Sequence, residues 1–410
     1  MEVIVQRCCG LDVHQRSITA CILRQGYARQ VRTFETTTTA LLALKDWLVA
    51  ERITHLAMES TGVYWKPVFN VLDGHFTLLL VNARQIKHVP GRKTDVMDAE
   101  WICQLLRAGL LRGSFVPPLI VRQLRDLTRY RKKLNGELQS EKNRIHKLLQ
   151  DGNVKLTSVL SDIFGKTGRQ VLDALRQGID DAGQLSALFT NKHLKATAEQ
   201  AAEAVRGCLT VHHRLLLGQM LDRLDFTVER IAHLDKQMVS LVATEFSGPY
   251  ARLQTIPGIS ALSAATILAE IGPDMTPFGS GAQLASWAGL CPGQKESAGV
   301  RASGRTRKGN NYLKTILVEC AWCAVRTKET YLRAKYYKLI PRMGKRKAMV
   351  AIAHKLLLAC YHVLKDEVDY RDLGADYLDQ AKQQRMIAYH LKALQKLGYT
   401  EELEPTESAA

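Results

Sequence analysis

Short apolar runs alternate with polar stretches in the first part of the chain, a pattern that predicts alternating strands and helices. The expected strands lie near residues 3–11, 17–24, 29–35, 54–59 and 76–81, and the expected helices near 38–51, 63–73 and 94–108. The first three strands are close enough in sequence to form hairpins, whereas a helical stretch separates the next two. Residues 1–118 are therefore expected to form an α/β domain that ends at a Pro-Pro break.

A different pattern begins after Pro118, where apolar residues recur at alternating spacings of four and three. Seven of nine positions are apolar in the first stretch, which contains Ile120, Leu124, Leu127, Arg131, Leu134, Leu138, Glu141, Ile145 and Leu148. Seven of eight are apolar in the second, which contains Leu217, Leu221, Leu224, Val228, Ile231, Asp235, Met238 and Val242. Residues 119–246 are thus predicted to form two coiled-coil helices around a helical insert. The helices can pair as an antiparallel hairpin or form a dimer arm, and the spacing does not choose between these.

The composition changes again after Ser247-Gly248-Pro249, and a mainly helical domain is expected over 247–365. Its segment Thr255-Ile-Pro-Gly-Ile-Ser260 resembles a helix-hairpin-helix turn, which can offer backbone N–H groups to a phosphate. The same residues also occur as a plain helix start. Residues 366–410 are expected to hold a helix near 375–397 and a disordered tail from Glu401. The chain as a whole is expected to be of the α/β plus α class.

Charge adds a polyanionic partner to this picture. The 410 residues carry a formal net charge of +17, which favours nucleic acid over a membrane surface because no basic amphipathic terminus is present. Between residues 293 and 347, fifteen Lys and Arg stand against three acids, a surplus of twelve. Nine cysteines without framework spacing, and the lack of a signal peptide or membrane-spanning run, predict reduced thiols in a cytoplasm.

Four acids stand where an α/β domain places catalytic groups. Asp12 follows the apolar run of the first strand, and Glu59 ends the fourth strand. Asp95 and Asp98 are three residues apart, so they share one face of the third expected helix, although taken alone they also suit a solvated helix start. Together the four carboxylates are hard oxygen ligands of the kind that Mg²⁺ takes, and they predict a site for one or two ions.

Acids on the first strand, the fourth strand and a late helix are the layout of an RNase H-like sheet. A basic loop beside this site, whose cations suit a phosphate backbone, contains Arg84, Lys87, His88, Arg92 and Lys93. The polar faces of 119–150 are also basic, with nine Lys and Arg against three acids. A solvated face and nucleic-acid contact explain that surplus equally well.

Several short motifs occur in a specific order along the chain. The first domain contains G-L-D-V-H around Asp12, M-E-S-T-G-V-Y-W around Glu59 and K-T-D-x-x-D-A around Asp95 and Asp98. The last domain contains I-P-G-I, A-G-L-C-P-G, E-S-A-G around Ser297 and R-x-S-G-R-T-R-K-G-N. In this order and spacing the chain resembles the DEDD-type transposases of the insertion-sequence 110/1111 group, the bridge-RNA-guided recombinases. Its E-S-A-G form is closer to the 1111 branch.

The resemblance implies a RuvC-like first domain in which Asp12, Glu59, Asp95 and Asp98 bind metal and Ser297 of the last domain is the nucleophile. A serine hydroxyl is a weak nucleophile unless it is activated, and Mg²⁺ held by acids can polarise the scissile phosphate. Ser303 is the nearest rival for this role. Cations beside the serine that can hold the DNA backbone or stabilise transition-state charge are Arg301, Arg305, Arg307 and Lys308.

The resemblance also implies partners. These are DNA at the element ends and target, a structured guide RNA, and further copies of the chain in a homo-oligomer, dimer or tetramer, whose active sites combine acids and serine from different subunits. Such a protein is expected in a prokaryotic cytoplasm, associated with the nucleoid.

Three functions are compatible with these residues. The favoured one is a transposase that cuts and rejoins DNA strands through a serine-linked phosphodiester. A RuvC-like junction resolvase or nuclease would use the four acids with metal-activated water. A non-catalytic nucleic-acid-binding scaffold would need only the basic helices. Ser297 and its basic neighbours separate the first function from the second, and the four acids separate both from the third.

Overall fold

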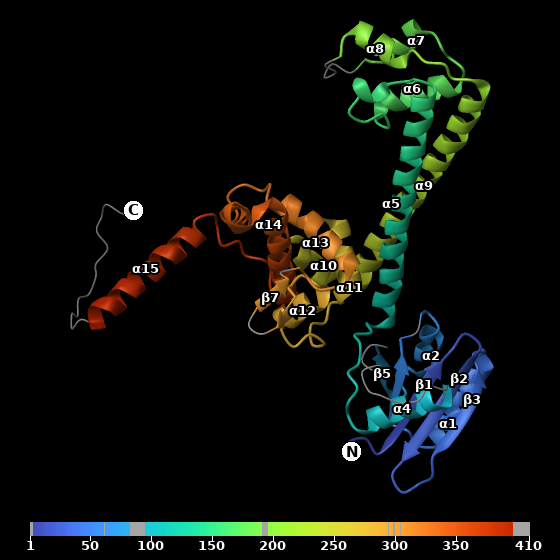
Figure 1. Cartoon of the computed structure of the whole chain (residues 1–410), viewed down its shortest axis with the longest axis vertical. Helices are drawn as coiled ribbons and strands as arrows, with labels where there is room; N and C mark the ends of the chain where they lie inside the picture. The colour runs from blue at the N-terminus through green and yellow to red at the C-terminus, as the bar shows by residue number, and fades with distance from the viewer. Residues whose placement is uncertain are drawn as a thin grey trace. The chain divides into compact units, whose positions relative to one another are not determined.

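The structure is a computed structural model of the whole chain, and it describes residues 3–60, 62–82, 95–190, 196–293, 295–297, 300–303 and 305–396 (Figure 1). The predicted basic loop with Arg84, Lys87, Arg92 and Lys93, and the predicted tail from Glu401, lie outside the described residues. Contacts divide the chain into two compact units, Met1–Pro117 and Pro118–Ala410.

The first unit is built on a five-stranded sheet, as the apolar runs predict. Its strands are β1 (Arg7–Val13), β2 (Ser17–Arg24), β3 (Gln30–Glu35), β4 (His55–Glu59) and β5 (Thr77–Val81), in the order β3-β2-β1-β4-β5. The first three strands are antiparallel, and β4 and β5 run parallel to β1.

The first strand is shorter than the prediction, which placed its start near residue 3. The backbone N–H groups of Ile4 and Val5 donate to the carbonyl oxygen of Arg107, at 3.0 and 3.1 Å, instead of joining the sheet. This partner is about a hundred residues away along the chain, so the apolar pattern alone does not reveal it.

Helices cover both faces of the sheet. On one face, α1 (Thr38–Ala50) and α2 (Trp65–Leu72) bury the side chains of Leu44, Leu48 and Leu72 against β1, β2 and β4. On the other face lies α4 (Asp95–Arg107), whose Ala99, Ile102 and Cys103 pack on Cys8 and Ala57. All three helices lie close to their predicted positions.

The second unit begins with two long helices that pack along their length, α5 (Leu119–Asp151) and α9 (Val211–Glu245) (Figure 1). Ion pairs at Arg131–Asp235, Arg223–Glu141 and His213–Asp151 show that they run antiparallel, because the residue number rises on one helix as it falls on the other. Two polar residues of the predicted seams, Arg131 and Asp235, therefore pair with each other.

The predicted seam of α9 is wrong at Val228, whose surface is 47% exposed. Thr227 is buried in its place and donates its hydroxyl to the carbonyl oxygen of Arg223. The buried residues thus follow the natural helical period of 3.6 rather than a strict heptad at this point.

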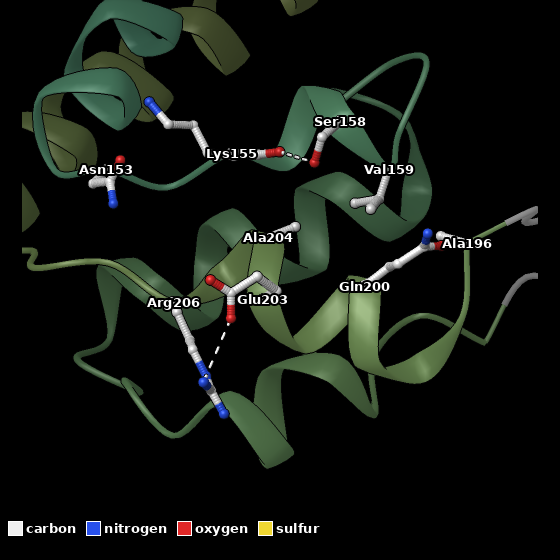
Figure 2. Close-up of a pocket in the computed structure, with 9 residues that line it drawn as sticks. All are labelled: Asn153, Lys155, Ser158, Val159, Ala196, Gln200, Glu203, Ala204 and Arg206. Carbon is white, nitrogen blue, oxygen red and sulfur yellow. Dashed lines mark hydrogen bonds and ion pairs between the residues drawn. The ribbon is translucent and has the colours of Figure 1, made fainter.

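A helical insert joins the C-terminal end of α5 to the N-terminal end of α9. It contains η1 (Leu156–Ser158), α6 (Lys166–Arg176), α7 (Ala182–Ser186) and α8 (Ala198–Val205), which share one apolar core with α5 and α9. An open cavity of about 550 Å³ lies between η1 and α8, where Lys155, Gln200 and the ion pair Glu203–Arg206 line it (Figure 2).

The rest of the second unit is mainly helical. Its elements are α10 (Ser247–Gln254), α11 (Ala261–Ile271), α12 (Gly281–Ala288), β6 (Lys295–Ser297), β7 (Val300–Ser303), α13 (Asn311–Ala324), α14 (Tyr331–Lys365) and α15 (Tyr377–Lys396). The I-P-G-I segment forms the turn between α10 and α11. Its Gly258 has a φ of +84°, and a Cβ there would lie 2.4 Å from the Cys320 carbonyl oxygen, so the turn packs tightly on α13.

Among the described residues, α14 is the one helix whose length and composition would allow it to cross a membrane. Its apolar stretch is 56% buried in the protein, where it packs against α12 and α13. The helix is bent at Gly344, which has a φ of 78°. Burial of this stretch is typical of a core helix.

Candidate active site

Two of the predicted acids lie at adjacent ends of parallel strands. The register of β1 and β4 pairs Leu11 with Met58, so Asp12 and Glu59 come one step further along the same direction. Asp12 has a side chain that is 13% exposed, and Glu59 is half-buried. Parallel strands bring their carboxyl ends to one edge of a sheet, and the two carboxyl groups therefore share this edge.

The acids of β1 and β4 also share a face of the sheet. A Cβ on Gly10 would lie 2.2 Å from the Ala99 carbonyl oxygen, so Gly10 faces α4. Side chains alternate along a strand, and Asp12 is two residues beyond Gly10, so it lies on the α4 side. Glu59 stands in the same relation to Ala57, which packs against α4.

The direction of α4 brings a third acid to the corner of the sheet where Asp12 and Glu59 lie, at the carboxyl ends of β1 and β4 on the face that α4 covers. The last residue of the helix, Arg107, accepts hydrogen bonds from Ile4 and Val5 just before β1 begins. The first turn of α4 therefore points toward the other end of β1, where Asp12 lies. That turn contains Asp98, which is half-buried and precedes Ala99. Asp95 begins the helix, and its side chain is not among those described.

The structure adds His14 to the corner. Its Nε2 lies 3.0 Å from Oδ2 of Asp12, and its side chain is 49% exposed. This histidine stands within the motif G-L-D-V-H, which by itself assigns it no role. The signal was its position two residues after the acid, on the same side of the chain as it leaves the strand.

The three described carboxylates fit Mg²⁺ in chemistry, because they are hard oxygen donors from three elements at one corner. In their present positions, no three Asp, Glu, His or Cys side chains in the described ranges are close enough to hold an ion.

The predicted nucleophile lies on a β-hairpin of the second unit. β6 and β7 are antiparallel, with Ser297 opposite Val300 and Lys295 opposite Ser303. Ser297 is thus next to the hairpin turn, whereas Ser303 lies at the other end of the paired residues. The side chains of both serines and of Arg301 are outside the described residues.

The hairpin continues into a paired stem. The N–H of Gly293 donates to the Arg305 carbonyl oxygen at 2.8 Å, and Pro292 pairs with Thr306. At its root the stem is compact, since a Cβ on Gly309 would lie 2.4 Å from the nitrogen of Gly289. The exposed cations Arg305, Arg307 and Lys308 lie on this stem.

The four acids therefore belong to the first unit and the serine hairpin to the second. Within the first unit the structure brings together Asp12, Glu59 and the helix turn that carries Asp98.

Comparison with known proteins matches both units. A family model for DEDD transposases of the IS110 type covers residues 9–153, and one described as the transposase IS116/IS110/IS902 family covers residues 250–338. The first match contains all four acids, and the second contains the serine hairpin and the α10–α11 turn.

Related proteins agree with these matches. A Pseudomonas aeruginosa protein named "Probable family 20 transposase" is 28% identical over 77% of this chain and 85% of its own length. The 42 kDa protein of insertion element IS900 in Mycobacterium paratuberculosis is 26% identical over 72% and 78%. The transposase of insertion sequence element IS1111A in Coxiella burnetii is 32% identical over 29% and 34%. With both family domains in the expected order, this chain belongs to the IS110/IS116/IS902 family of transposases.

Proposed function

We propose that this transposase cuts and rejoins DNA strands through a serine-linked phosphodiester, with Mg²⁺ held by Asp12, Glu59, Asp95 and Asp98 of a RuvC-like domain. The observation that carries the proposal is the convergence of Asp12, Glu59 and the first turn of α4 on one face and one edge of the sheet. Acids at such a position are costly to bury without a cation, so their grouping favours an ion site. The strand order β3-β2-β1-β4-β5 is the one expected for an RNase H-like sheet.

The proposed exchange conserves bonds. Oγ of Ser297 forms a bond to phosphorus while the bond between phosphorus and one sugar oxygen breaks, and the serine proton ends on the departing sugar oxygen. A hydroxyl group of another strand then attacks the same phosphorus and releases the serine. Each phosphodiester is replaced by another, so no external energy source is needed. When bound, Mg²⁺ would polarise the phosphate and stabilise the charge that develops.

Charge on the second unit supports a nucleic-acid partner. Arg305, Arg307 and Lys308 are exposed on the hairpin stem, and α14 has nine Lys and Arg in 35 residues and no acid. Phosphate contacts of this kind supply affinity with little dependence on sequence. We extend the proposal to a structured guide RNA, a homo-oligomer with shared active sites, and the nucleoid of a prokaryotic cytoplasm. These three rest on the family resemblance.

A junction resolvase or nuclease is the second candidate. It is favoured by one observation, that the three described acids all come from elements of the first unit. In that case metal-activated water would replace Ser297 and no covalent intermediate would form.

Acid substitutions test the metal site. Asp12→Asn, Glu59→Gln and Asp98→Asn should each abolish strand cleavage and leave DNA affinity within about threefold, because phosphate contacts dominate binding. Asp46→Asn is the matched control, since Asp46 lies on α1 of the same unit with a side chain that is 73% exposed. Cleavage that persists after removal of divalent metal would count against the proposal.

A further inference from the structure

A fully buried carboxylate lies where three elements of the second unit meet. Glu270, near the end of α11, is 0% exposed. Taking a charge out of water is strongly unfavourable unless partners compensate for it, so the partners of this residue define its role. It was not among the residues that the sequence singled out, because it is one acid within an otherwise apolar helix.

Two arginines of α5 hold Glu270. Arg129 makes a bidentate pair, with Nε to Oε1 and Nη2 to Oε2 both at 2.9 Å. Arg125 donates to the backbone carbonyl oxygens of Ala269 and Glu270, at 2.9 and 2.7 Å, and so binds the end of α11. Burial by itself lowers the pKa of Arg129, but its hydrogen bonds to Glu270 raise the pKa above the ordinary value. Arg129 therefore stays charged beside the carboxylate.

The third partner is Asn310, which comes from the root of the serine hairpin. Its Nδ2 donates to Oε2 of Glu270 at 2.6 Å. Its side-chain oxygen accepts from the N–H groups of Tyr312 and Leu313, at 3.0 and 3.1 Å, and so caps α13. One side chain thus begins α13 and binds the buried carboxylate.

Asn310 follows directly on the compact root of the hairpin stem. Gly309, its neighbour, packs against Gly289 on the opposite side of the stem. The guanidinium of Arg129 also lies over the ring of Tyr312, with 4.6 Å to the ring centre. The start of α13 and the hairpin root are therefore both attached to α5.

We propose that Glu270 is a positioning residue for the serine hairpin, which it holds to α5 through Asn310 and Arg129. This inference rests on the proposed function, because it assigns the hairpin a reacting serine. It goes further in naming the element that orients the hairpin within the second unit, which is the long helix α5 (Leu119–Asp151). A buried ion pair is weak evidence for a contribution to stability, so we assign Glu270 a role in fixing the geometry of the hairpin root instead.

Single substitutions of Glu270 and Asn310 test whether the hydrogen bond between them positions the hairpin, while the cap that Asn310 provides for α13 is kept. Glu270→Gln keeps the shape but cannot accept hydrogen bonds at both of its terminal atoms. Asn310→Asp keeps the oxygen that caps α13 but replaces the donor with a second carboxylate. Each variant should lower the single-turnover rate of protein–DNA adduct formation at least tenfold at saturating DNA, since small displacements of a reacting group are costly. DNA affinity should stay within threefold.

The double variant Glu270→Gln/Asn310→Asp provides a rescue. It exchanges amide and carboxylate, so the amide of residue 270 can donate to the carboxylate of residue 310. The same amide nitrogen then faces Nη2 of Arg129, which donates to Oε2 in the wild type, so that bond is not restored. We therefore expect a partial recovery, to a rate above that of either single variant and below that of the wild type. The control is Arg131→Gln, which breaks the bidentate pair between α5 and Asp235 of α9 and has no contact with the hairpin root in the described structure. It should leave the rate within threefold.

Hydrogen exchange gives a readout that does not depend on activity. In Glu270→Gln, the N–H of Gly293, which donates to Arg305 across the stem, should exchange faster without a matching change in α11. The proposal is supported if the Gly293 N–H exchanges faster in Glu270→Gln than in the wild type and the wild type forms the protein–DNA adduct. If the wild type forms no adduct while Gly293 exchange still rises, the hairpin attachment stands and the proposed function fails. Unchanged exchange, an unchanged rate in Glu270→Gln, or an equal loss in Arg131→Gln would overturn the inference.

Discussion

Gly10 of β1 lies so close to Ala99 of α4 that an added Cβ would stand 2.2 Å from the Ala99 carbonyl oxygen. This contact sets how near the first turn of α4, with Asp98, comes to Asp12. It is backbone against backbone, so neither side can rotate away from a larger residue.

Gly10→Ala should therefore displace α4 and disturb the acid corner. We expect the free energy of unfolding to fall by about 1–3 kcal/mol, as in other overpacked cores, and metal-dependent cleavage to be lost. Gly136→Ala on α5 is the control, because a Cβ there meets nothing within 4 Å, and it should be neutral or stabilise by up to about 1 kcal/mol. Chemical denaturation and a cleavage assay measure both effects. Full activity in Gly10→Ala would show that α4 tolerates the shift.

The seam of α9 offers a second test. Leu221 is fully buried and Val228 is 47% exposed, although both fit the same heptad. Leu221→Ala should cost about 2–5 kcal/mol, whereas Val228→Ala should change the free energy of unfolding by less than about 0.5 kcal/mol. Urea titrations of the two variants give the comparison. A large fall in stability for Val228→Ala would indicate that a further surface covers this face of α9.

The basic, acid-free composition of α14 supplies a third prediction. Lys335 has a pKa below its ordinary value because of burial and then the nearby cations Lys355, Lys338 and Arg342. A phosphate bound there would raise this pKa again, since it favours the charged amine. Arg342→Gln and Lys345→Gln each remove one cation that can bind a phosphate. Either change should therefore make the slope of log affinity against log salt shallower by about 0.9.

The control variant is Lys236→Gln, which removes an exposed lysine of α9. It should leave the slope of log affinity against log salt unchanged. Titrations of labelled duplex DNA at several salt concentrations provide the slopes. Equal slopes for the wild type and the α14 variants would remove α14 from the nucleic-acid surface.

Much of the fold follows from local pattern. The five strands and the two long helices are encoded by runs and spacings within a few residues of one another, and those predictions are confirmed. One failure involves a distant partner, and the other involves the period of a single helix. The backbone N–H groups of Ile4 and Val5 donate to the Arg107 carbonyl oxygen instead of joining the sheet. On α9, Thr227 is buried at the position predicted for Val228, because the helical period of 3.6 does not match a strict heptad.

For the candidate site too, some residues follow from local sequence patterns and others do not. Strand ends and helix spacing predict Asp12, Glu59, Asp95 and Asp98 as a group, and the structure places Asp12, Glu59 and the helix turn of Asp98 at one edge of the sheet. Glu270 was not predictable, because its partners lie 141 residues away at Arg129 and 40 residues away at Asn310. No local motif marks an acid whose purpose is to join three separate elements.

The central claim is that Ser297 becomes covalently joined to DNA, and a denaturing gel with labelled element-end DNA, guide RNA and Mg²⁺ tests it most directly. The wild type and Ser303→Ala should each yield a labelled protein–DNA band, while Ser297→Ala should yield none and still bind DNA and RNA, because one hydroxyl contributes little to a phosphate-dominated interface. A band that survives in Ser297→Ala and disappears in Ser303→Ala would move the nucleophile to the other end of the hairpin. Cleavage without a band in all three proteins would contradict the serine mechanism and leave metal-activated water as the nucleophile.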